Sequence, residues 1–174
     1  MDDGGLAHGC VLASTGKASD AIQMLTSAIT AFRATGSTWS LPFRLACLAK
    51  AHAELGQFAE ASRRLDEAMM IVEVSKEVWA QAEILRVAGE IVLMSPGHDA
   101  TSAEAYFERA LLVARQQQAK SWELRAATSL ARLWRSQGKP QQARELLTPV
   151  YDWFTEGFDT RDLKEAKGLL TELQ

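Results

Sequence analysis

The sequence predicts an all-α fold, a right-handed alpha-alpha superhelix of about four helix pairs closed by a C-terminal capping helix. Residues 120–157 read as an amphipathic helix, a glycine turn and a second amphipathic helix. Weaker copies of this unit precede it, and Trp39, Trp79 and Trp122 recur 40 and 43 residues apart. A helix-turn-helix unit repeated at this period is typical of a solenoid, in which each unit packs on its neighbours.

The unit at 120–157 is the clearest guide to how each pair is built. Gly138 supplies the left-handed backbone that ends many helices. Pro140 suits the first turn of the next helix, because an N–H at that position has no helical partner. Pro149 is expected to kink this second helix, since proline removes one hydrogen bond and crowds the preceding turn, and Gly157 is expected to end it.

The same pattern divides the whole chain, which is predicted to be a single domain over residues 1–174. Weaker units are expected at 1–36, 38–76 and 77–118. A short amphipathic helix at 160–173 should cover the open end of the stack, because a terminal repeat exposes an apolar face.

Three local motifs allow more detailed predictions. Thr101 with Glu104 three residues later has the spacing of a capping box. His52 is expected to be packed and hydrogen-bonded, because no second histidine or cysteine lies three or four residues away to complete a metal site. Cys10 and Cys47 are far apart in the sequence, and both are expected to be reduced thiols.

The composition argues against several classes of function. The net charge of −3 and the pI near 5.7 argue against nucleic-acid binding by the whole surface. No basic leader and no long apolar run occurs, so a cytoplasmic protein without membrane contact is expected. No catalytic constellation, cofactor motif or metal-ligand spacing is recognised, so the chain is not expected to be an enzyme.

The best candidate for a functional surface is the concave wall, which the first helix of each pair should line. Its charges are mixed in the middle and basic toward the C-terminus, which suits an acidic or helical peptide. The alternative is that the wall charges pair with each other, for example Glu90 with Arg132. The predicted wall residues are Lys50, Glu54, Glu83, Arg86, Glu90, Arg125, Thr128, Arg132 and Arg135.

The pattern inside each unit resembles a known repeat family. A small residue in the first helix, glycine at the turn and A-x3-[LF]-x2-A in the second helix resemble tetratricopeptide (TPR) repeats, with HEAT-like packing as the alternative. The segment from SWELRAATSLARLW to WFTEGFDT further resembles the C-terminal TPR-like region of bacterial signalling proteins. Those proteins carry a class III nucleotide cyclase domain, a STAND-type ATPase domain, or both. The resemblance implies a regulatory protein–protein interaction region without catalysis, since neither upstream domain is present.

Two further functions stay open at this stage. The glycine-rich first helix has no helix before it, so its edge could stack on a second copy to form a homo-oligomer. A small molecule could bind in the groove against Trp79 or Trp122, although packing between repeats is the simpler interpretation of these rings. Whether the chain is whole or part of a larger cyclase or ATPase protein also stays open.

Overall fold

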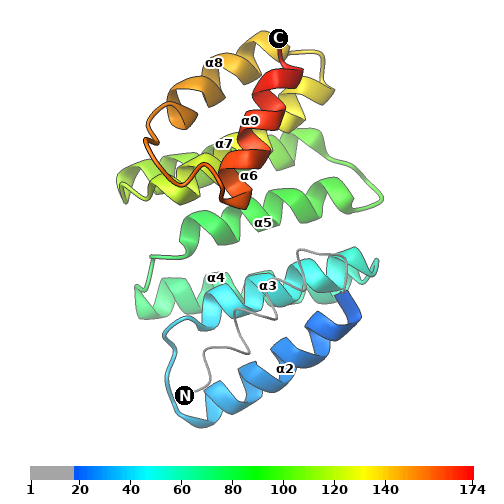
Figure 1. The fold of residues 1–174 in the computed structure, drawn as a ribbon. Coiled ribbons are helices and arrows are strands. Elements are labelled where there is room, and N and C mark those ends of the chain that lie inside the picture. Colours follow the sequence, from blue (N-terminus) through cyan, green and yellow to red (C-terminus); the bar gives the residue numbers. More distant parts are fainter. Residues whose placement is uncertain (1–17) are drawn as a thin grey trace.

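The structure of this chain is a computed structural model that describes residues 18–174, and this part folds into eight helices without a strand. The helices stack one after another into an elongated superhelix, as Figure 1 shows. In chain order they are α2 (Ala18–Ala34), α3 (Leu41–Glu54), α4 (Phe58–Ser75), α5 (Gln81–Met94), α6 (Ala100–Gln116), α7 (Lys120–Ser136), α8 (Pro140–Tyr151) and α9 (Arg161–Glu172).

The helices pair as the sequence pattern predicts. Helix α3 packs on α4, α5 on α6, and α7 on α8, while α3, α5 and α7 also contact one another in succession and so form one wall. Helix α9 packs on both α7 and α8, in the position of a cap. Helix α2 is the second helix of the first unit, and the first helix predicted for that unit lies outside the described residues.

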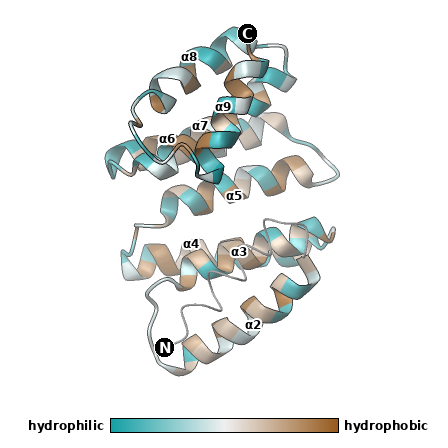
Figure 2. Ribbon diagram, viewed as in Figure 1, coloured by the Kyte–Doolittle hydropathy of each residue, from teal (hydrophilic) through white to brown (hydrophobic). Residues whose placement is uncertain are grey.

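The repeat motif places its small and apolar residues in the interior. In α6, Ala103, Phe107 and Ala110 are at most 1% exposed. Figure 2 shows that hydrophobic and hydrophilic residues alternate along the helices. The ring of Phe107 lies directly against Gly89 of α5, where an added Cβ would be only 2.5 Å from the ring atom Cε1. Glycine at this position therefore lets α5 and α6 approach closely around a large side chain.

The glycine turns also agree with the prediction, but the end of α8 does not. Gly56 and Gly138 adopt φ values of +74° and +76°, which are unfavourable for residues with a Cβ. Helix α8 ends at Tyr151, so the prediction that Gly157 ends it is wrong. Pro149 has no N–H and so removes a hydrogen bond from the last turn of α8. The loop that follows the helix is held by ring contacts such as Tyr151 with Phe158.

Helix α6 begins without the predicted capping box. Asp99 is its N-cap residue, and one carboxylate oxygen accepts a hydrogen bond from the Ser102 N–H at 3.0 Å. Glu104 instead accepts a hydrogen bond from the indole of Trp134 at 2.6 Å. An aspartate in the preceding turn is a better cap than Thr101, because its carboxylate also interacts favourably with the positive end of the helix dipole.

One cysteine differs from the expectation of reduced thiols. Cys47, half-buried in α3, is disulfide-bonded, and Cys10 lies outside the described residues. The separation of two cysteines along the chain can exclude a local motif such as C-x-x-C, but it cannot exclude a disulfide. Whether two cysteines pair depends on how the fold brings them together.

Candidate functional site

Five of the nine predicted wall residues meet in one set of ion pairs that crosses α3, α5 and α7. We call this set the inner-wall network: Lys50, Glu83, Arg86, Glu90 and Arg125. Arg86 donates from Nε and Nη2 to the two carboxylate oxygens of Glu83, both at 2.8 Å, and it also pairs with Glu90. Lys50 Nζ lies 2.8 Å from Glu90, and Arg125 Nη1 lies 3.0 Å from Glu83. The network therefore joins three successive units.

The centre of the network is buried, with Glu83 4% and Arg86 5% exposed. Burial alone would raise the pKa of Glu90, but the charges of Arg86 and Lys50 outweigh it and lower that pKa to about 2. The carboxylates of Glu83 and Glu90 raise the pKa of Arg86 despite its burial. These groups satisfy one another and so hold the wall together.

The pKa of Glu90 predicts a loss of stability in acid. The pKa is about 2 in the folded chain and 4.5 ordinarily, so ionised Glu90 stabilises the fold at higher pH. This contribution, about 3 kcal/mol, is lost as the pH falls from about 5 to about 2. Urea titrations across this range should show the free energy of unfolding falling, and Glu90→Gln should make the fall smaller. An equal fall in the variant would contradict the prediction.

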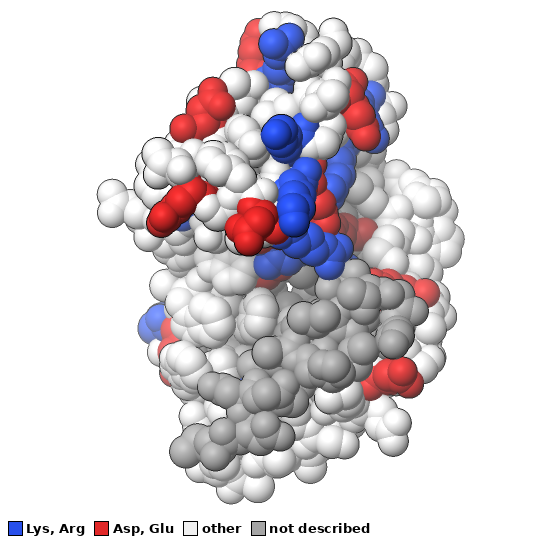
Figure 3. Space-filling view, viewed as in Figure 1, with Lys and Arg blue, Asp and Glu red and all other residues white. Residues whose placement is uncertain are grey.

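The basic end of the wall is covered by α9. Figure 3 shows lysines and arginines gathered beside this helix, with acidic side chains among them. The wall charges do pair with each other, as the alternative expected, but Glu90 pairs with Lys50 and Arg86 and not with Arg132. Each of the three arginines at the basic end faces an acidic residue of α9. The ion pairs are Arg125–Asp162 (3.7 Å), Arg132–Glu165 (2.9 Å) and Arg135–Glu172.

This role of α9 was not predicted, although its acidic residues are visible in the sequence. Asp162, Glu165 and Glu172 lie beside the apolar stripe of the helix, which buries Leu163 and Leu169. Opposite charges on two neighbouring helices were thus present in the sequence. Only the packing of α9 against α7 shows that they meet.

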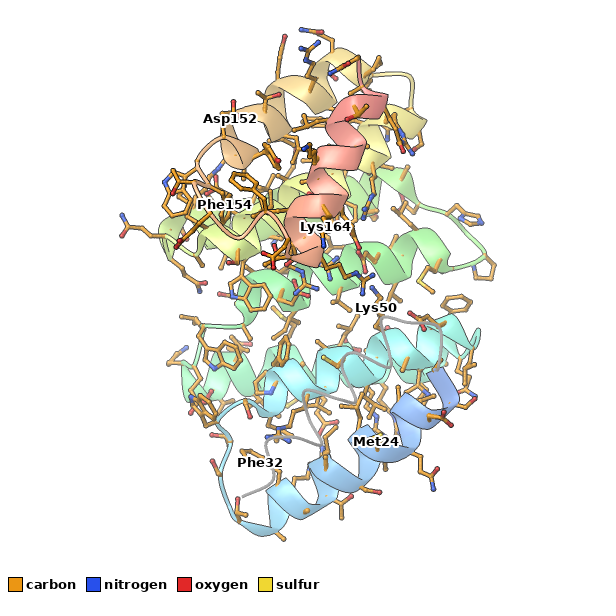
Figure 4. The ribbon with its side chains drawn as sticks, in the orientation of Figure 1. Met24, Phe32, Lys50, Asp152, Phe154 and Lys164 are labelled. Atoms are coloured by element: carbon orange, nitrogen blue, oxygen red, sulfur yellow. The ribbon has the colours of Figure 1, made fainter. Side chains whose placement is uncertain are left out.

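The two remaining wall residues stay outside the network. Thr128 is 5% exposed, and its hydroxyl donates to the Leu124 carbonyl at 2.8 Å. Glu54 is half-buried, and burial raises its pKa. Lys50, labelled in Figure 4, points from α3 toward α5. Of the predicted wall residues, only Arg132 and Arg135 are exposed.

A row of aromatic rings lies where the second helix of one unit connects to the first helix of the next. We call Trp39, Phe43, Trp79 and Trp122 the aromatic edge. Trp39 stacks on Trp79 with ring centroids 5.9 Å apart, and Phe43 lies 5.7 Å from Trp79 and 6.1 Å from Trp122. The predicted packing between repeats is therefore confirmed. Trp39 is nevertheless 58% exposed and Trp79 37%, so much of the row faces solvent.

A surface cavity of about 610 Å³ lies at the start of α7. Lys120 and Arg115 share the carboxylate of Glu123, at 2.7 and 2.9 Å, which leaves one net positive charge. Lys120 Nζ also lies 5.5 Å from the ring centre of Trp153. Phe154, labelled in Figure 4, lines one side of this cavity. The cavity is lined by Arg115, Gln118, Lys120, Ser121, Trp153 and Phe154.

Other predicted site features can be placed as well. His52 is 9% exposed, and its Nδ1 lies 2.6 Å from the Gln57 side-chain oxygen, so it is packed and hydrogen-bonded as predicted. Within residues 18–174, no group of three or more histidine, cysteine or acidic side chains could hold a metal ion. None of the helices in this described part combines the length and the apolar character that crossing a bilayer requires.

Comparison with known proteins supports the fold. The chain is similar to the nearly identical TPR-like repeats of a putative kinesin light chain from Podospora anserina. A single-residue variant of that protein aligns with a TM-score of 0.66 at 17% identity, and a second crystal structure of it with 0.63 at 18%. Each alignment covers 99% of this chain and 84% of the other. No family model and no curated protein matches. The chain therefore has the fold of a right-handed, TPR-like superhelix.

Proposed function

We propose that this chain is a non-catalytic protein–protein interaction scaffold that binds an extended segment of a partner protein. The observation that carries the proposal is the aromatic edge, a row of partly exposed rings that spans three units. Exposed tryptophans commonly mark binding surfaces, because they give a large contact area at a low cost in side-chain entropy. Folds of this kind commonly bind protein partners, which is consistent with the proposal.

The chemistry of this edge favours a particular kind of segment. Successive ring centres lie about 6 Å apart, so apolar side chains of an extended segment can contact them one after another. The cavity at the start of α7 carries a net positive charge and aromatic walls, which suit an acidic residue of the partner.

A substitution at the aromatic edge tests the proposal directly. Peptides selected from a displayed random library on the unmodified chain should bind Trp39→Ala and Trp79→Ala at least about tenfold more weakly, since each ring supplies buried contact area. Fluorescence polarisation of labelled peptides measures the affinity. Met70→Ala is the matched control, because Met70 is 64% exposed on α4 and is not part of the aromatic edge. Equal affinity for all variants would rule out the aromatic edge as the site.

We propose that this scaffold works within bacterial nucleotide-cyclase or STAND-type signalling. The sequence resemblance of its C-terminal segments supports that placement. Co-purification with a cyclase or ATPase subunit in the source cell is the expected result. The proposed self-association would use an edge that lies outside the described residues.

A further inference from the structure

A cavity of about 190 Å³ lies between the second and third units, among α4, α5 and α6. Its floor is apolar and is built by residues of α4 and α5. Three clusters of buried side chains meet at this floor, because Ile84, Leu85 and Ile91 belong to different clusters. The floor residues are Leu65, Met69, Ile84, Leu85, Ile91 and Val92.

The size of the cavity limits what can enter it. A cavity of about 150 Å³ lined by aliphatic side chains stays dry and accepts benzene. This cavity is slightly larger, so it can take a phenyl ring or a branched aliphatic chain. Filling it would bring apolar groups against both α4 and α5, which are less closely packed here than the two helices of a pair.

The rim of the cavity is charged with both signs. Asp66 lies on α4, and Arg109 with Tyr106 lies on α6. Asp66 and Arg109 are exposed, and neither forms an ion pair or side-chain hydrogen bond within the described part of the chain. One negative and one positive group give the rim no net charge. A ligand with one charge would match only one of them, whereas a zwitterion can match both.

We propose that this cavity binds a free α-amino acid with an apolar side chain. The side chain fills the apolar floor, the ammonium group pairs with Asp66, and the carboxylate pairs with Arg109. This site is separate from the aromatic edge and does not depend on the proposed peptide binding. The groove position beside Trp79 or Trp122, suggested by the sequence, is a different place. A bound ligand would touch α4 and α6 together and so tie the two halves of the stack.

The test measures binding to the intact chain by isothermal titration calorimetry and by the shift in Tm. Leucine, methionine and phenylalanine are the probes, with isoamylamine and 4-methylpentanoate as analogues of leucine that lack one charge. At least one amino acid should bind and raise Tm, because a ligand that binds only the folded chain stabilises it. Each leucine analogue should bind at least about tenfold more weakly than leucine.

Two rim variants separate the proposed contacts. Asp66→Asn should weaken amino-acid binding at least about tenfold and leave the binding of 4-methylpentanoate unchanged, because this analogue has no ammonium group. Arg109→Gln should also weaken amino-acid binding at least about tenfold but leave the binding of isoamylamine unchanged, because this analogue has no carboxylate. The controls are Asp20→Asn and Arg144→Gln, which make the same charge changes at exposed positions on α2 and α8. Both controls should bind like the unmodified chain.

Two results would overturn the proposal. One is the absence of heat and of a Tm shift with every probe at millimolar concentration. The other is binding of benzene or isobutylbenzene as tightly as leucine, with no change in the rim variants, since the cavity would then be only an apolar void. The rim positions are exposed, so these variants are expected to fold, and circular dichroism checks this.

Discussion

Replacing Arg86 by methionine is expected to destabilise the chain by about 3 kcal/mol, because it leaves the buried Glu83 without its main partner. Removing one member of a buried ion pair commonly costs about 3–5 kcal/mol. The lower end applies here, since Arg125 still pairs with Glu83 and Lys50 with Glu90. Methionine keeps the apolar stem and is a good helix former, so the effect reports the lost charge.

Thermal and urea unfolding measure this effect. A loss of about 3 kcal/mol corresponds to a fall in Tm of about 6–12 °C for a chain of this size. Arg63→Met is the matched control, because Arg63 pairs with Glu60 at the same i,i+3 spacing but is 67% exposed, and it should change stability far less than Arg86→Met. Similar losses in the two variants would show that the inner-wall network does not stabilise the wall.

Replacing Gly89 by alanine is the second large effect, expected to cost about 1–3 kcal/mol. The new Cβ would lie 2.5 Å from Cε1 of Phe107, and that ring is only 1% exposed. The ring cannot move without displacing α5 or α6, since it fills the interface between them. The usual gain in helix propensity from alanine, about 1 kcal/mol, should therefore not appear.

A double-mutant cycle with Phe107→Leu identifies the cause. Leucine removes the ring atoms that the new Cβ would meet, so Gly89→Ala should cost much less in that background. Urea unfolding of the four chains gives the coupling free energy, expected to be about 1 kcal/mol or more. If Gly89→Ala were equally costly with leucine at 107, close packing against Phe107 would not explain the glycine.

The sequence by itself determined the helices, their pairing and the all-α superhelix. Apolar spacing near 3.6 residues and glycines such as Gly56 and Gly138 act locally, so they can be read without the fold. The sequence predicted the helix ends less well. Pro149 weakens the end of α8 before the expected stop at Gly157, and Asp99 caps α6 before the expected cap at Thr101. Local hydrogen bonding decided both cases.

The tertiary structure alone decided which charges pair and which rings are exposed. Arg125, Arg132 and Arg135 read as an open basic face, yet α9 returns along α7 and pairs with all three. Likewise, Phe43 contacts Trp79, which lies 36 positions further along the chain. Ion pairs and ring contacts act over a few ångströms in space, so a linear sequence names the groups but not their partners.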